Sequence, residues 1–267
     1  MKTKNNWCTS NLNDRFLNKN IKFEVYLKPY KFNKIDFNTA CEKAAIEIYE
    51  KYKNLYLAFS GGMDSDYILR LFHRLNIPIT PIIVCYGNET ENWYAHNTCK
   101  QLKVTPIIIK PTTEKFMKTF YEEIYLKYNG VGIHSTQVYF AYDVIKDGTL
   151  ITGGNTMGHG QELIGEDNFA DVSEYDYYIP NSIDLLTYTP EIIYSIMESV
   201  KNNVGVEWNI FKSNLYGIEH RDKIRARYDS NINLFLSKLS TIENTTMCHH
   251  SWNKKEMFKI FDGYVND

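Results

Sequence analysis

The most constraining feature of this chain is a short glycine-containing loop between an apolar segment and a helical one. Residues 60–65 read Ser-Gly-Gly-Met-Asp-Ser and follow an apolar run at 55–59. Apolar residues recur at helical spacing over 66–72, so the loop joins a buried strand to a helix. Glycines let the backbone approach an anion closely, and the helix N-terminus offers free N–H groups and the positive end of its dipole. The sequence therefore predicts a phosphate-binding loop.

The side chains of this loop suggest a division of roles. We expect Ser60, Gly61, Gly62 and Ser65 to bind the phosphates of a nucleotide, the serines through their hydroxyl groups. Asp64 would repel a bare phosphate, so we expect it to hold Mg²⁺ against one and to serve in catalysis. The chain has no Gly-x-x-x-x-Gly-Lys-Ser/Thr sequence, and no Gly-x-Gly-x-x-Gly follows the strand. Two common nucleotide-binding loops are thereby excluded.

Strand and helix patterns alternate around this loop. Strands are expected at 55–59, 79–86, 104–109 and 149–152, and helices at 64–75, 90–102, 113–128 and 135–146. Strands that read as continuous apolar runs between helices indicate an α/β fold whose parallel sheet, of about five strands, is covered on both faces. Ligands of such sheets bind at the carboxyl ends of the strands, where the 60–65 loop lies.

The two ends of the chain have different patterns. We expect a strand over 21–28, a helix over 38–52 with Asn38 as its cap, and C-terminal helices over 189–203, 217–228, 231–240 and 253–261. The helix over 38–52 carries an apolar stripe of Ala44, Ala45, Ile48 and Tyr49. The chain is therefore predicted to divide into an extension packed on the core (1–52), a nucleotide-binding domain (53–180) and a helical C-terminal region that closes over the site (181–267).

Composition excludes several classes of protein. The formal net charge of −2 argues against non-specific electrostatic binding of nucleic acid. No apolar run reaches the roughly 18 residues of a membrane helix, and the first residues lead into no hydrophobic signal segment. The five cysteines are scattered and form no Cys-x-x-Cys pair, which is typical of free thiols in a reducing cytoplasm. We expect a cytoplasmic protein that acts on a small molecule.

A second glycine-rich segment, 153–160, follows the strand at 149–152. It reads Gly-Gly-Asn-Thr-Met-Gly-His-Gly, and four glycines in eight residues indicate a backbone that bends sharply or approaches a ligand. Because the carboxyl ends of parallel strands share one edge, we expect Gly153, Gly154 and Asn155 to join the loop at 60–65 in binding the phosphates of the ligand.

The segment Ser60 to Ser65 resembles the pyrophosphate loop, Ser-Gly-Gly-x-Asp-Ser, of the N-type ATP pyrophosphatases (the PP-loop, adenine nucleotide alpha hydrolase-like superfamily). The order of elements, with segments 87–95 and 134–140, is similar to the synthetase domain of asparagine synthetase over roughly 53–165. The resemblance implies a Rossmann-like, five-stranded α/β/α sandwich with ATP and Mg²⁺ as cofactors. It also implies cleavage of ATP between its α- and β-phosphates to adenylate a substrate oxygen.

The chain departs from that family in its second loop. Asparagine synthetases have a Gly-x-Gly-x-Asp-Glu segment there, whereas this chain has no Asp-Glu pair. Asn155 can still bond phosphate or substrate, and Glu162, Glu166 or Asp167 can supply a carboxylate. The family often carries a glutaminase domain whose nucleophilic cysteine follows the initiator methionine. Here that position is Lys2, so any ammonia is expected to be free or to come from a partner.

A basic cluster lies in the C-terminal region. Arg221, Lys223, Arg225 and Arg227 fall within two helical turns. One interpretation is that these side chains form a solvated face. The other is that they stabilise the charge that develops on the α-phosphate and pyrophosphate. In that case Lys223 and Arg225 are catalytic, and at least one of Lys223, Arg225 and Arg227 faces the second glycine-rich segment near Asn155. The upstream segment 212–216 is expected to line the same cleft.

The preferred interpretation is an ATP-dependent adenylating synthetase that forms an amide or a similar bond. One alternative is a nucleobase- or tRNA-modifying enzyme of the same superfamily, in which Cys85 carries sulfur. Another is a nucleotide-binding protein without turnover, which the missing Asp-Glu pair favours. Cys248, His249 and His250 are weak candidates for a metal site because no further ligand has suitable spacing.

Overall fold

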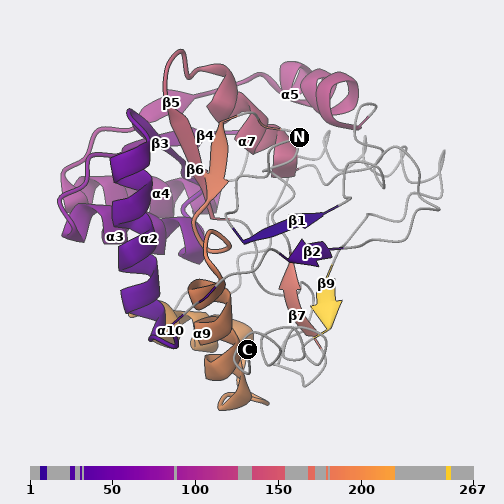
Figure 1. The fold of residues 1–267 in the computed structure, drawn as a ribbon. Helices are drawn as coiled ribbons and strands as arrows, with labels where there is room; N and C mark the ends of the chain where they lie inside the picture. The colour runs from indigo at the N-terminus through magenta and orange to yellow at the C-terminus, as the bar shows by residue number, and fades with distance from the viewer. Residues whose placement is uncertain are drawn as a thin grey trace.

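A computed structural model describes residues 7–10, 25–27, 31, 33–86, 89–125, 134–153, 168–171, 179, 181–219 and 251–253. Its central element is a five-stranded sheet of order β5-β4-β3-β6-β8 (Figure 1). The strands are β3 (Leu55–Ala58), β4 (Thr80–Val84), β5 (Ile107–Ile109), β6 (Thr149–Thr152) and β8 (Ser182–Asp184). Every neighbouring pair is parallel, which confirms the predicted α/β fold with a five-stranded parallel sheet.

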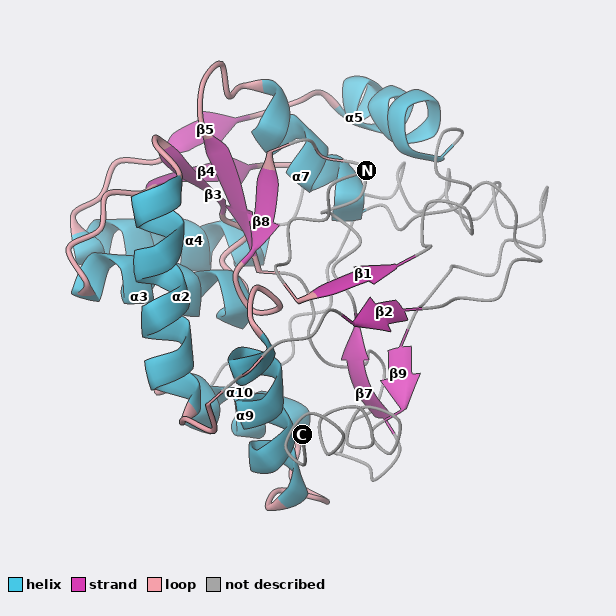
Figure 2. Cartoon of the chain, in the orientation of Figure 1, coloured by secondary structure: helices cyan, strands magenta, loops and turns pink. Residues whose placement is uncertain are grey.

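Helices cover both faces of the sheet, as the sequence pattern predicted (Figure 2). They are α2 (Phe37–Lys51), α3 (Met63–Arg74), α4 (Glu89–Leu102), α5 (Thr113–Thr119), the π-helix η1 (Phe120–Tyr125), α7 (His134–Asp143), α9 (Pro190–Lys201) and α10 (Trp208–Tyr216). One buried cluster joins Leu57, Ile83 and Ile151 to α2, α3, α9 and α10. A second joins Ile82 and Leu150 to α5, η1 and α7. Neighbouring residues of β3, β4 and β6 therefore pack against helices on opposite faces of the sheet.

Two further strand pairs lie outside the main sheet. β1 (Cys8–Ser10) pairs antiparallel with β2 (Val25–Leu27), and β7 (Asn168–Asp171) pairs antiparallel with β9 (Ser251–Asn253). β2 falls within the strand expected over 21–28. Among the described residues, no helix is both long enough and apolar enough to cross a bilayer.

The N-terminal helix α2 begins at Phe37, one residue before the predicted start. α2 is capped by Asp36, whose carboxylate accepts a hydrogen bond from the Thr39 N–H at 3.0 Å. The predicted cap, Asn38, is instead inside the helix and accepts a bond from the Tyr67 hydroxyl at 3.2 Å. Of the predicted apolar stripe, Ala44, Ala45 and Ile48 are buried, but Tyr49 is 49% exposed.

Several other elements differ from their predicted limits. The helix expected over 113–128 changes to π-helical geometry at Phe120, and residues 126–128 lie outside the described part. The helix expected from 217 is wrong at its start, because Gly217 has φ +61° and ends α10. Asn253 lies in β9 and does not open a helix. Residues 220–240 and 254–261, on which the other predicted C-terminal helices fall, lie outside the described residues.

Residues after position 180 continue the α/β core. β8 pairs with β6, with Thr152 opposite Asp184, and so adds the outermost strand of the sheet. α9 packs against α2, and buried residues of α9 and α10 belong to the same apolar cluster as α3. The described residues after 180 therefore pack into the apolar cluster that contains α2 and α3, and the division of the chain into three parts stays a prediction.

Candidate functional site

The loop between β3 and α3 lies at the carboxyl edge of the sheet. Helix α3 begins directly after it, with Gly62 at the N-cap and no side chain capping the helix. Gly61 has φ +84°, a conformation that residues with a Cβ rarely adopt. The N–H groups of the first turn of α3 thus have no side-chain cap, as an anion-binding helix end requires.

The two serines of the loop form hydrogen bonds within it. The Ser60 Oγ accepts a hydrogen bond from the Gly62 N–H at 3.1 Å, and the Ser65 Oγ donates to the Gly62 carbonyl at 3.1 Å. The two hydroxyl oxygens lie 3.2 Å apart. The structure therefore brings Ser60, Gly61, Gly62 and Ser65 into one compact loop, and their role as phosphate ligands stays a prediction.

The start of the second glycine loop lies beside α3. A Cβ on Gly153 would lie 2.8 Å from the Ile68 Cδ1 atom and 3.4 Å from the Asp64 Cβ atom. A Cβ there would displace the end of the Ile68 side chain, so the end of β6 lies directly against the start of α3. Both glycine loops begin at one edge of the sheet, whereas Gly154 and Asn155 lie outside the described residues.

A small cavity opens between this edge and α7. Its volume is about 70 Å³, and it is lined by Ala58, Phe59, Ser60, Ser65, Ile82, Val84, Gln137, Val138, Ala141, Thr152 and Gly153. The walls are mostly apolar, and the two serines and Gly153 place the glycine loops at its border. Such a wall suits the flat face of a nucleobase next to a phosphate loop. The cavity is smaller than the roughly 300 Å³ of a complete small-molecule site.

Asp64 is held by two side chains of α10. The Lys212 Nζ atom lies 2.7 Å from Asp64 Oδ2, and the Tyr216 hydroxyl donates to Asp64 Oδ1 at 2.5 Å. The side chains of Lys212 and Asp64 are only 7% and 16% exposed, so this is a mostly buried ion pair. Segment 212–216 was expected to line the cleft, whereas no sequence pattern pairs Lys212 or Tyr216 with Asp64.

Aromatic packing fixes Tyr216 in this position. Its ring stacks on Tyr67 of α3, with centroids 4.7 Å apart, and on Phe37 of α2, at 5.6 Å. Burial, and then the neighbouring Asp64 carboxylate, raise the pKa of Tyr216 well above its ordinary value. The phenol is therefore protonated at neutral pH and acts as a donor to Asp64.

The arrangement does not fit Mg²⁺ on Asp64. Both carboxylate oxygens already accept bonds, and a divalent cation on either oxygen would be repelled by the Lys212 ammonium. The described residues also contain no group of three or more His, Cys, Asp or Glu side chains that could hold a metal ion. Mg²⁺ on Asp64 stays a prediction that requires Lys212 and Tyr216 to move.

The remaining candidate residues are Cys85 and a group that lies outside the described part of the chain. Cys85 follows β4, and burial raises the pKa of its thiol, so the reactive thiolate is disfavoured at neutral pH. The basic cluster of Arg221, Lys223, Arg225 and Arg227 lies outside the described residues, as do Glu162, Glu166, Asp167, Cys248, His249 and His250. Lys212 is thus the described basic residue that reaches the first loop.

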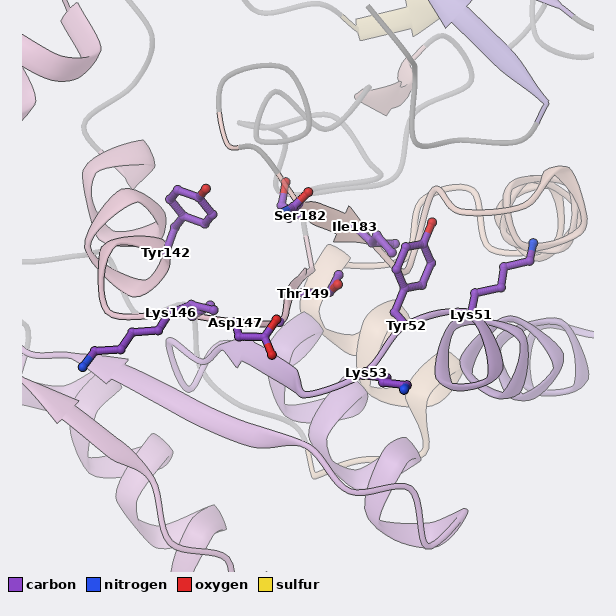
Figure 3. A pocket seen from close by; sticks show the side chains of 12 residues that line it. Lys51, Tyr52, Lys53, Tyr142, Lys146, Asp147, Thr149, Ser182 and Ile183 are labelled. Carbon is purple, nitrogen blue, oxygen red and sulfur yellow. The ribbon is translucent and has the colours of Figure 1, made fainter.

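A larger pocket, of about 530 Å³, lies at the opposite edge, where β3, β6 and β8 begin (Figure 3). Three lysines line it, but Lys51 forms an ion pair with Glu47. The ammonium ends of Lys51 and Lys146 point to opposite sides in Figure 3. No set of polar side chains converges there among the labelled residues, and parallel sheets bind ligands at the other edge. We therefore place the candidate site at the glycine loops.

Comparison with known proteins finds similarity at the level of structure only. No protein-family model matches the chain, and no curated protein matches it. An NH3-dependent NAD synthetase from Campylobacter jejuni shares 17% identity with a TM-score of 0.39, over 79% of this chain and 86% of that one. An NMN synthetase from Francisella tularensis shares 14% identity with a TM-score of 0.36, over 81% and 99% respectively. Similarity at this level transfers neither substrate nor activity to this chain.

Proposed function

We propose that this chain is an ATP-dependent adenylating synthetase that cleaves ATP to AMP and pyrophosphate. The observation that carries the proposal is the uncapped N-terminus of α3 behind a Ser-Gly-Gly-x-Asp-Ser loop at the carboxyl edge of a parallel sheet. The β- and γ-phosphates would bind the free N–H groups of the first turn. The nucleobase would lie along the apolar wall between the sheet and α7.

The ion pair of Asp64 supports anion binding at this helix end. A lone carboxylate in the first turn would repel the phosphates. Here the Lys212 ammonium, 2.7 Å from Asp64 Oδ2, compensates the negative charge of Asp64. The Tyr216 hydroxyl further satisfies the carboxylate. The net charge presented to the ligand by these three side chains is therefore close to zero, and the helix dipole and N–H groups dominate.

The chemistry follows from holding the β- and γ-phosphates as a unit. A substrate carboxylate oxygen attacks the α-phosphorus, and the bond to the β-phosphate oxygen breaks with its electron pair leaving on pyrophosphate. A nitrogen nucleophile then attacks the activated carbonyl carbon, and AMP leaves. The amide product and ammonia as the nitrogen source are the finer part of the proposal, and they rest on the resemblance to asparagine synthetase.

A second candidate is a protein that binds ATP without turning it over. It is favoured by the absence of an Asp-Glu pair in the segment 153–160. A tRNA-modifying enzyme has less support, because the net charge is −2 and burial disfavours the thiolate of Cys85.

Exchange of labelled pyrophosphate into ATP tests the proposal. We expect exchange with one member of a panel of carboxylate acceptors that includes aspartate, because reversible adenylation returns label to ATP. The variant Ser65→Ala, which loses the bond to the Gly62 carbonyl, is expected to slow exchange about tenfold or more. ATP binding without exchange for any acceptor would favour the binding-only protein. Retention of tRNA on a filter at physiological salt would favour the modifying enzyme.

A further inference from the structure

The ammonium group of Lys212 is buried, but its hydrogen-bonding capacity is only partly used. The side chain is 7% exposed, and its Nζ atom lies 2.7 Å from Asp64 Oδ2. An ammonium has three N–H donors, and among the described residues Asp64 is its one hydrogen-bond acceptor. The Nζ atom also lies over the ring of Trp208, 5.9 Å from the ring centroid. At least one N–H group is therefore left for a further acceptor, and an unfilled donor on a buried charge is unfavourable.

This ammonium lies at the end of α3 whose backbone N–H groups are uncapped. The first bond of the helix runs from the Asp66 N–H to the Gly62 carbonyl at 2.9 Å, so the N–H groups of residues 63–65 precede the helical ladder. Asp64, which holds the ammonium, belongs to this first turn. The end of β6 reaches the same residue, since a Cβ on Gly153 would lie 3.4 Å from the Asp64 Cβ atom. A side-chain cation and the free end of a helix are thus brought together at the glycine loops.

We propose that Lys212 is a phosphate ligand at this helix end, and that Asp64 positions its ammonium group instead of holding a metal ion. This inference rests on the proposed function, because the ligand is the phosphate chain of the same nucleotide. Tyr216 donates to Asp64 Oδ1 at 2.5 Å, which leaves Oδ2 for Lys212. The carboxylate offsets the desolvation of the ammonium before any ligand binds. A phosphate oxygen then becomes a further acceptor for a cation that is already in place, so the site binds phosphate groups without a divalent cation.

Calorimetric titration with inorganic pyrophosphate in EDTA tests this site without measuring turnover. We expect the wild type to bind, and Lys212→Met to bind about tenfold or more weakly, because a hydrogen bond from a charged donor is lost. Lys201→Met is the matched control, since it removes a lysine that pairs with Glu198 on the exposed side of α9, and it should bind as the wild type does. Lys212→Gln removes the same charge but keeps a donor for Asp64, so it repeats the test if the methionine variant does not fold.

Two further titrations separate ligand binding from a structural role. Adenosine has no phosphate, so wild type and Lys212→Met should bind it equally. Asp64→Asn keeps an oxygen that can accept a bond from Lys212 and removes one negative charge near the ligand. This variant should therefore bind pyrophosphate in EDTA no more weakly than the wild type does, whereas loss of a metal ligand would weaken binding in Mg²⁺.

The outcomes distinguish this inference from the proposed function. Equal pyrophosphate affinities for wild type and Lys212→Met would overturn the role of Lys212 alone, as would pyrophosphate binding that requires added Mg²⁺. Equal losses for pyrophosphate and adenosine would also overturn it, because a structural role of Lys212 affects both ligands. In each of these cases ATP binding and pyrophosphate exchange by the wild type would persist. Absence of ATP and pyrophosphate binding with and without Mg²⁺ would overturn the proposed function as well.

Discussion

Replacing Asp64 by alanine is expected to lower the free energy of unfolding by about 3 kcal/mol, because it leaves the ammonium of Lys212 buried without its partner. The Lys212 side chain is only 7% exposed, and its Nζ atom lies 2.7 Å from the carboxylate that would be removed. Urea unfolding of wild type and Asp64→Ala measures the difference.

A double-mutant comparison separates this charge effect from a general loss of packing. Lys212→Met keeps the length of the side chain and removes its charge, while Tyr216 continues to donate to Asp64. We expect Lys212→Met to cost about 1 kcal/mol, and the double variant Asp64→Ala/Lys212→Met to be more stable than Asp64→Ala alone. Additive losses in the double variant, or a loss below 1 kcal/mol for Asp64→Ala, would show that the pair is not the buried ion pair of the structure.

Replacing Gly61 by alanine is expected to lower the affinity for ATP about tenfold or more, in addition to costing about 1 to 2 kcal/mol of stability. Gly61 has φ +84° in the middle of the loop, so a Cβ strains the conformation that aligns the loop with the first turn of α3. Relief of that strain would rotate the peptide groups that face the phosphates. Calorimetric titration with ATP measures the affinity.

Gly205 offers a matched control for this variant. It has the same φ of +84°, and a Cβ there would meet no atom within 4 Å. Gly205→Ala should therefore cost a similar amount of stability while leaving ATP affinity unchanged. Equal ATP affinities for wild type and Gly61→Ala would mean that the loop does not bind the nucleotide.

The sheet and its first loop could be predicted because their signals are local. The apolar runs at β3, β4 and β6 are flanked by helical patterns, and the glycines mark the turn between β3 and α3. β8 has the sequence Ser-Ile-Asp, with one apolar residue, so no run identifies it. Its strand conformation depends on pairing with β6 at the edge of the sheet.

Sequence patterns did not predict α10, the helix whose side chains contact Asp64. α10 begins after Glu207, which caps the Ile210 N–H but is not among the residues that commonly signal a helix start. Gly217 does signal a helix end, yet it was assigned to the start of the next helix. The pairing of Asp64 with Lys212 could not be predicted from local patterns, because it joins residues 148 positions apart.

The role of the basic cluster in the C-terminal region stays a prediction. Lys223 and Arg225 lie beyond the described residues, so their proximity to the second glycine loop stays a prediction. Lys212 shows that a cation from the C-terminal region does reach the first loop. Alanine variants at positions 223 and 225 should lower turnover while leaving ATP affinity nearly intact, if those side chains stabilise the leaving pyrophosphate.

The proposed function requires the loop to hold the β- and γ-phosphates as a unit, so that the bond between the α- and β-phosphates is broken. Separation of the products of ATP labelled at the α-phosphate tests it directly, in the presence of the acceptor that supports pyrophosphate exchange. We expect labelled AMP in equal amount to pyrophosphate, and loss of both products in the Gly61→Ala variant at low ATP. Labelled ADP as the main product would contradict it.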